Sequence, residues 1–362
     1  MIKFIDSISS NDPQAYMNGK LIDFWEILNP RKVNGDLKKI SICKKLSSLL
    51  EKYQAGDYLG TVARGCRATE IRHIQYLEYL ERNDYQKLKA IVLASPNELD
   101  TYVNEAFAIL HRSDISILSN GVWQTVGLGK LLSEDVFSYS SFRKSDKCIS
   151  FYKSLGIDKK HCLYCGDAKL NVISKEVPNA NNGYRSRDGK ILFDLDHFYL
   201  KSRYPFLSMS FYNLVPCCGL CNSRYRSTKN FDITSHINPY FESFDDNYFF
   251  EFDQMEVAIA LRSSDPHLEK LNLSLRPNAH KVGDITARDL CIEERYQEQL
   301  HYINSLFKEI IYYSDKSWDE IEFIVCGVDY DRIPNNRKNI LDVSMAKFKM
   351  DFLDMIKPRL DL

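Results

Sequence analysis

The chain has 362 residues, of which 44% are hydrophobic and 27% charged, and its formal net charge is −1. This composition is ordinary for a globular protein and excludes attraction of polyanions through total charge, so any nucleic-acid affinity must come from local basic clustering. No run of about 18 apolar residues occurs, and the first residues lack the apolar segment of a secretory signal. We therefore expect a cytoplasmic protein with no membrane partner.

The N-terminal part, residues 1–145, has mainly helical patterning. Apolar residues recur at helical spacing over 69–93, and Ser95, Pro96 and Glu98 form a predicted capping box that opens the next helix. We predict a helical N-terminal region that binds a partner or the substrate.

The middle of the chain, residues 146–250, contains the strand signals. A polar insert over 178–190 has a turn signal at Asn182-Gly183 and precedes a predicted strand over 191–193, which delivers Asp196 and His197 at its end. A second strand is predicted over 211–215, and the chain from Asn222 onward suits a short helix.

The C-terminal part, residues 251–362, is predicted to begin with a hairpin and to continue as helix. Alternating apolar residues over 250–252 and 257–261 suggest the two strands of the hairpin. Two helices follow, over 288–313 with Thr286 as its cap and over 335–356 before Pro358. The expected fold class is α+β, a predominantly helical chain with a small central domain that contains the predicted strands.

Cysteines are concentrated in the middle of the chain. Five of the ten lie between residues 162 and 221, which favours metal thiolates in a reducing compartment over disulfides. Two CxxC pairs can hold one tetrahedral zinc ion through four thiolates, and this register uses Cys162, Cys165, Cys218 and Cys221. Cys217 is an alternative ligand in place of its neighbour. The scattered cysteines are expected to be free and mostly buried thiols: Cys43, Cys66, Cys148, Cys291 and Cys326.

The pair Asp196-His197 and the residue Asn222 have the chemistry of a second metal site. Hydrolysis of a phosphodiester needs a divalent ion to neutralise developing charge and a base that activates water near neutral pH. Asp196 offers a hard oxygen ligand for Mg²⁺ or Mn²⁺, Asn222 offers an amide oxygen, and His197 is the candidate base. The zinc, closed by four sulfurs, is expected to be structural. A buried structural Asp-His pair is the alternative interpretation.

These residues carry a family resemblance over about residues 160–245. The pattern Cys-Leu-Tyr-Cys-Gly at 162–166, then Asp196-His197, then Asn-Leu-Val-Pro-Cys-Cys-Gly-Leu-Cys-Asn at 213–222 resembles the HNH endonucleases with the ββα-metal fold. The resemblance implies that His197 is the general base, that Asp196 and Asn222 bind the catalytic ion, and that Asn213 constrains the loop that orients the base. HNH chemistry usually leaves 5′-phosphate and 3′-hydroxyl ends.

The flanking sequence, such as Asn-Pro-Tyr-Phe-Glu-Ser-Phe-Asp-Asp at 238–246, is similar to the HNH proteins of antiphage modules of the Septu and retron-associated kind. That similarity implies a defence effector acting with an ATPase of the ABC/SMC type. Leu200 stands where the family often has proline. Arg224, Tyr225 and Arg226 stand near where it has a lysine, which leaves the phosphate clamp undefined.

Basic residues gather beside the proposed site. From 198 to 230 the chain has five and no acid, and we expect them to contact substrate phosphates: Lys201, Arg203, Arg224, Arg226 and Lys229. His236 lies near enough to be an alternative ligand or phosphate contact. The sequence thus predicts a metal-dependent endonuclease, with DNA as its expected substrate. The competing hypothesis is a non-catalytic zinc-ribbon module that binds nucleic acid or a protein.

Overall fold

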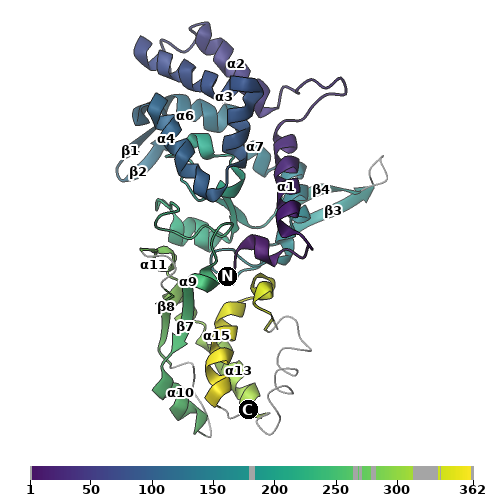
Figure 1. The fold of residues 1–362 in the computed structure, drawn as a ribbon, viewed down its shortest axis with the longest axis vertical. Helices are drawn as coiled ribbons and strands as arrows, with labels where there is room; N and C mark the ends of the chain where they lie inside the picture. The colour runs from purple at the N-terminus through teal and green to yellow at the C-terminus, as the bar shows by residue number, and fades with distance from the viewer. Residues whose placement is uncertain are drawn as a thin grey trace.

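The computed structural model describes residues 2–178, 184–263, 268, 271–278, 283–312, 333–334 and 336–359. The molecule is elongated, with the N-terminal helices at one end and the last helices at the other (Figure 1). Within the described residues the strands form four separate two-stranded antiparallel sheets, β1-β2, β3-β4, β5-β6 and β7-β8. The α+β, predominantly helical character that the sequence predicts is confirmed.

The N-terminal half is helical except for one small hairpin. Its elements are α1 (Pro13–Leu28), α2 (Ile42–Gln54), α3 (Arg67–Leu93), α4 (Leu99–Ile109), α5 (Arg112–Ile115), β1 (Ser116–Ser119), β2 (Val122–Thr125), α6 (Gly127–Leu131), a π-helix (Leu132–Val136) and α7 (Tyr139–Arg143). The predicted capping box is present, since the Glu98 carboxylate accepts the Ser95 amide at 2.9 Å. The predicted helix over 69–93 is interrupted, because Asn83, Asp84 and Tyr85 have left-handed backbone angles.

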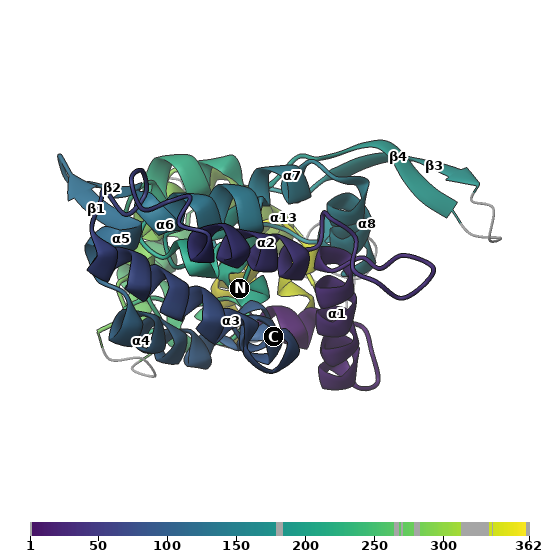
Figure 2. The same cartoon turned by 90° about the horizontal axis from the view of Figure 1, so that it is seen from above.

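The central segment begins with α8 (Asp146–Ser154) and contains two strand pairs, of which β5-β6 carries the candidate site. Its remaining elements are β3 (Val172–Pro178), β4 (Tyr184–Ile191), β5 (Asp194–His197), β6 (Leu214–Cys217) and a π-helix (Leu220–Arg226). The predicted Asn182-Gly183 turn lies outside the described residues. The β3-β4 hairpin projects sideways from the long axis, as the view from above also shows (Figure 2).

The C-terminal part contains α9 (Phe244–Asn247), β7 (Tyr248–Phe252), α10 (Gln254–Leu261), β8 (Leu273–Pro277), α11 (Thr286–Asp289), α12 (Ile292–Gln297), α13 (Leu300–Tyr312) and α15 (Ala346–Ile356). The predicted strand over 257–261 is wrong. The Asp253 carboxylate caps helix α10 by accepting two backbone amides, and β7 pairs instead with the more distant β8. Five apolar residues that alternate between large and small side chains could not outweigh a strong helix start.

The predicted continuous helix over 288–313 is also wrong, because it is divided into α11, α12 and α13. Cys291 has a left-handed φ of 49° and separates the first two. Thr286 lies inside α11 rather than capping it, and its hydroxyl donates to Asp284 and accepts the Ile237 amide. Residues 337–342 form a 3₁₀-helix instead of the start of the last α-helix.

Aromatic contacts join the N-terminal region to the central segment. The Phe24 ring of α1 lies 5.3 Å from that of Phe151 in α8 and 5.4 Å from that of Phe211, which precedes β6. All three rings are buried. The expected boundary at residues 145–146 therefore does not separate two hydrophobic cores. No helix among the described residues has the length and apolar character needed to cross a bilayer.

Candidate metal centre and ββα site

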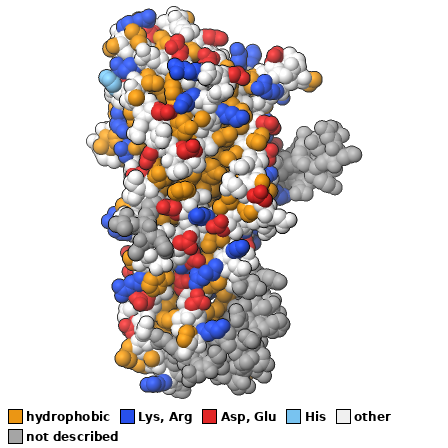
Figure 3. All heavy atoms as spheres, viewed as in Figure 1, with side chains coloured by type: hydrophobic (Ala, Val, Ile, Leu, Met, Phe, Trp, Pro, Cys, Tyr) orange, Lys and Arg blue, Asp and Glu red, His pale blue; other side chains and the backbone are white. Residues whose placement is uncertain are grey.

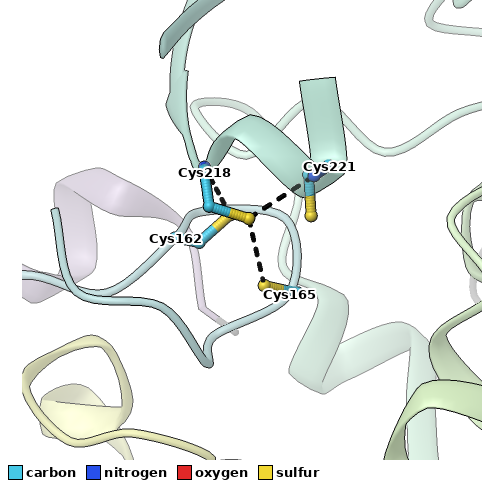
Figure 4. Close-up of side chains that lie close together, drawn as sticks. All are labelled: Cys162, Cys165, Cys218 and Cys221. Carbon is cyan, nitrogen blue, oxygen red and sulfur yellow. Dashed lines mark hydrogen bonds between the residues drawn. The ribbon is translucent and has the colours of Figure 1, made fainter. Parts of the chain in front are cut away.

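The four cysteines of the two CxxC pairs converge on one point. Their sulfur atoms lie within 4.8 Å of one another, and all four residues are buried. The first pair lies in a turn before β3; the second connects the end of β6 to the Leu220–Arg226 helix (Figure 4). Two backbone amides, of Cys218 and Cys221, point at sulfurs at 3.3 and 3.4 Å. Amides aimed at sulfur stabilise thiolates.

The arrangement fits a tetrahedral zinc ion. With Zn–S bonds of about 2.3 Å, a regular tetrahedron places its sulfurs about 3.8 Å apart. The Cys165 and Cys218 sulfurs are separated by 3.9 Å. Among the described residues, this is the only convergence of three or more cysteine, histidine or carboxylate ligand atoms. Cys217, the alternative ligand, is not part of it and faces Asp194 across the β5-β6 ladder.

A cation from the C-terminal part lies against this cluster. Arg295 of α12 donates to the Cys221 sulfur at 3.3 Å, and its guanidinium packs over the Tyr225 ring at 4.5 Å. The neighbouring Tyr296 donates its hydroxyl to the Cys165 carbonyl oxygen. Although burial opposes it, the Cys221 and Cys165 thiolates raise the pKa of Arg295. Four thiolates around Zn²⁺ would carry a net charge of −2, part of which Arg295 would compensate.

The β5-β6 hairpin and the following helix form a ββα unit. Asp196 pairs with Val215 across the hairpin and His197 pairs with Leu214. Because successive strand residues point to opposite faces, Asp194 and Asp196 share one face of β5 while His197 points to the other. The helix lies over the face with the two carboxylates, where its side chains contact both of them.

Asp196 is buried, and one of its carboxylate oxygens has two partners. Its carboxylate accepts the Tyr164 hydroxyl at 2.8 Å, and the Nε of Arg226 lies 3.0 Å from the same oxygen. Only 3% of Asp196 and 1% of Arg226 are exposed. Burial raises the pKa of Asp196, and the Arg226 charge and the Tyr164 hydrogen bond act against that rise.

Asn222 is paired with a different carboxylate. Its amide nitrogen donates to Asp194 at 3.0 Å, and both residues are partly exposed. The two predicted ligands of the catalytic ion thus have different partners in this structure. The residue beside Asn222 is Asp194, which the sequence analysis did not single out. The Asp-Leu-Asp alternation was the available signal, since it places two carboxylates on one strand face.

His197 is held by the loop that follows it. One ring nitrogen, Nε2, lies 3.0 Å from the Ser208 carbonyl oxygen, and the Tyr139 ring packs edge-on at 4.5 Å between centroids. Burial lowers the pKa of His197 to about 3, and the nearby charges of Lys201 and Arg226 contribute to that shift. Because a carbonyl can only accept, Nε2 carries the proton and Nδ1 keeps its lone pair.

Asn213 fixes the same loop. Its side-chain oxygen accepts the Tyr199 amide at 2.6 Å, and its nitrogen donates to the carbonyls of Tyr199 and Leu207 at 3.2 and 2.9 Å. The side chain is fully buried. Asn213 therefore closes the loop that supplies the Ser208 carbonyl to His197.

The five basic residues of 198–230 are placed differently from one another. Arg224 is exposed, and Lys201 and Arg203 are partly exposed. Lys229 donates to the Asp289 carbonyl oxygen while part of its side chain remains exposed. Arg226 is placed differently from the expected phosphate contact: its guanidinium is buried against Asp196, donates to the carbonyls of His197 and Phe198, and is only 1% exposed.

The structure also places His236 and four of the five scattered cysteines. His236 stacks on Phe231 at 3.8 Å between ring centroids and pairs with Asp289 at 3.2 Å, away from the four cysteines. Of the scattered cysteines, Cys43 and Cys148 are buried, Cys291 is partly exposed and Cys66 is exposed, which corrects the expectation for Cys66. Cys326 lies outside the described residues.

Comparison of the chain with family models, curated proteins and solved structures found no match.

Proposed function

We propose that this protein is an endonuclease of the HNH type that hydrolyses nucleic-acid phosphodiester bonds, with DNA as the expected substrate. The observation that carries the proposal is the bracing of His197. Its Nε2 is held by the Ser208 carbonyl, and Asn213 closes the intervening loop through three backbone contacts. A neutral imidazole with a fixed tautomer is suited to accept a proton from water.

The zinc ion would be structural. Four thiolates complete its tetrahedral shell and leave no position for water or substrate. Its role would be to join the first CxxC turn to the helix that carries Asn222. Structural zinc contributes folding free energy, because the four ligands are brought together only in the folded chain.

A catalytic Mg²⁺ or Mn²⁺ fits Asp194 and Asn222 better than Asp196. The Asp196 charge is balanced by Arg226, whereas Asp194 and Asn222 are partly exposed and their side chains meet. Turning the Asn222 amide would place two hard oxygen ligands side by side. A divalent ion bound there would neutralise the charge that develops on the phosphate.

Cleavage assays with the purified full-length, zinc-loaded protein test this function. Supercoiled plasmid and a structured RNA are each incubated with Mg²⁺, Mn²⁺ or neither, for the wild type and for His197→Ala, Asp194→Asn and Asp196→Asn. We expect metal-dependent cleavage, loss of about 10²-fold or more in His197→Ala, and a greater loss of activity in Asp194→Asn than in folded Asp196→Asn. Wild-type cleavage by His197→Ala would exclude His197 as the base.

The zinc-ribbon module remains the second candidate. The observation that favours it is the burial of the Asp196–Arg226 pair, which resembles an ion pair that stabilises a fold. It predicts nucleic-acid or protein binding with no cleavage under any of the metal conditions above. The role in antiphage defence and the partner ATPase stay predictions from the resemblance, and co-purification with the product of a neighbouring ATPase gene would test them.

A further inference from the structure

Two arginines from distant parts of the chain lie over the same aromatic rings. Arg112 begins α5, just before the β1-β2 hairpin, and Arg203 lies in the loop after His197. Their guanidinium carbons are 5.3 and 5.1 Å from the ring centre of Trp123 in β2, and 5.7 and 5.0 Å from that of Tyr204. We call Arg112, Trp123, Arg203 and Tyr204 the arginine–aromatic platform.

The positive charge of the platform is not balanced. Within the part of the chain that the structure describes, neither Arg112 nor Arg203 forms an ion pair. Arg112 Nη1 and Arg203 Nε are buried nitrogens without a hydrogen-bond partner. Burial, and next the charge of Arg203, lower the pKa of Arg112. Arg112 also forms a side-chain hydrogen bond with Tyr204. Two close guanidiniums without an acidic partner repel each other, and an anion placed beside them would be stabilised.

The platform also presents an apolar surface. Trp123 is partly exposed, and Leu118, its direct cross-strand partner, is 59% exposed on the same face of the hairpin. Figures 1 and 2 show this hairpin at the margin of the helical body. An aromatic ring beside unpaired guanidiniums suits a nucleotide, because the ring can stack on the base while the arginines contact the phosphate.

The platform is connected to the candidate site. Arg203 lies six residues after His197, in the stretch that Asn213 braces, and the Ser116 hydroxyl donates to the Arg203 carbonyl at 3.3 Å. The N-terminal region supplies Arg112 and Trp123, whereas the nuclease segment supplies the other two residues. Over the face drawn in Figure 3, cationic and anionic side chains are interspersed, so a local cluster such as this one is needed to hold a polyanion.

We propose that the arginine–aromatic platform is a second nucleic-acid contact, which grips an unpaired nucleotide of the strand that His197 cuts. This inference rests on the proposed nuclease function and assigns the N-terminal region a part in substrate binding. A single strand is favoured over a duplex because stacking on Trp123 needs an unpaired base. An acidic protein segment would use the arginines but would gain little from the exposed ring.

Binding is tested with the full-length, zinc-loaded protein in the His197→Ala background, which prevents cleavage. A fluorescein-labelled single-stranded 20-mer and the matching duplex are titrated by anisotropy at several salt concentrations. Arg112→Gln and Arg203→Gln should each weaken binding and lower the slope of log K against log salt by about 0.7 for the single strand. Trp123→Leu should weaken binding about fivefold or more, while Trp123→Phe keeps a stacking ring and should lose less.

As a matched control, two exposed lysines outside the platform, Lys32 and Lys39, are both changed to glutamine. The slope of log K against log salt for this variant should equal that of the His197→Ala protein. Thermal melting confirms that each variant is folded. If folded Arg112→Gln keeps its affinity and slope, or loses no more affinity than the lysine control, the platform is not a nucleic-acid contact. The proposed nuclease function would be unaffected by that result. Preference for the duplex would overturn the single-strand assignment. Absence of both binding and wild-type cleavage would overturn the nuclease function as well.

Discussion

Replacing Arg226 by Met tests whether the Asp196–Arg226 contact is a buried structural ion pair. The atoms are 3.0 Å apart, and the two residues are 1% and 3% exposed. At an effective dielectric constant of about 20, unit charges at that separation interact by about 5.5 kcal/mol before the cost of their desolvation. Removing one partner of a buried pair costs about 3–5 kcal/mol, because the other charge is left unpaired. The variant also leaves the carbonyls of His197 and Phe198 without their donor.

The free energy of unfolding, measured by urea titration with circular dichroism on zinc-loaded protein, should therefore fall by about 3–5 kcal/mol. Arg224→Met is the matched control, since Arg224 is exposed two residues away on the same helix. Its effect should be within about 0.5 kcal/mol. The double variant Arg226→Met with Asp196→Asn should recover part of the loss, because no charge is left buried.

The pH dependence has a defined sign. Burial raises the pKa of Asp196, and Arg226 acts against that rise. Without Arg226 the native carboxyl binds protons that the unfolded chain releases, so the stability of Arg226→Met falls as pH rises. The loss of stability in Arg226→Met relative to wild type should thus shrink as pH is lowered toward the ordinary pKa of a carboxyl, about 4. An Arg226→Met protein as stable as Arg224→Met, with no pH dependence of the difference, would refute the ion pair.

Three further predictions concern the four-cysteine cluster and the loop that follows His197. Cys218→Ser should lower zinc content, measured by elemental analysis, together with the melting temperature, whereas Cys217→Ser should keep full zinc; the reverse pattern would move the ligand to Cys217. Arg295→Met should release zinc to a colorimetric chelator with about 10–100-fold lower apparent affinity, and an affinity equal to wild type would show that this cation does not balance the thiolates. Asn213→Ala should lose roughly 3 kcal/mol of stability from three lost backbone contacts and reduce kcat more than KM; cleavage at the wild-type rate in the folded variant would disconnect the loop from the base.

Local sequence patterns were sufficient to predict some features of the fold and of the candidate site. The two CxxC spacings predicted the four-sulfur cluster, since two intervening residues bring both sulfurs of a pair to one point. The capping box at Ser95 and Glu98 was confirmed for the same reason, because it depends on contacts three residues apart. The catalytic roles of His197 and Asn222 stay predictions.

What the sequence determined by itself is therefore the local chemistry: which residues could hold zinc, and which helices could start where they do. Only the tertiary structure decided which charges meet. The sequence predicts Arg226 as a surface phosphate contact, whereas in the structure its helix places it against the buried Asp196. The contact between Asp194 and Asn222 likewise arises from the packing of that helix on β5. Arg295, 74 residues beyond Cys221, reaches the sulfur cluster only through the folding of the C-terminal part. The spacing of residues along the chain determines contacts between residues a few positions apart. Contacts between residues far apart in the sequence depend on how whole helices and strands pack, and a local sequence pattern does not predict that packing.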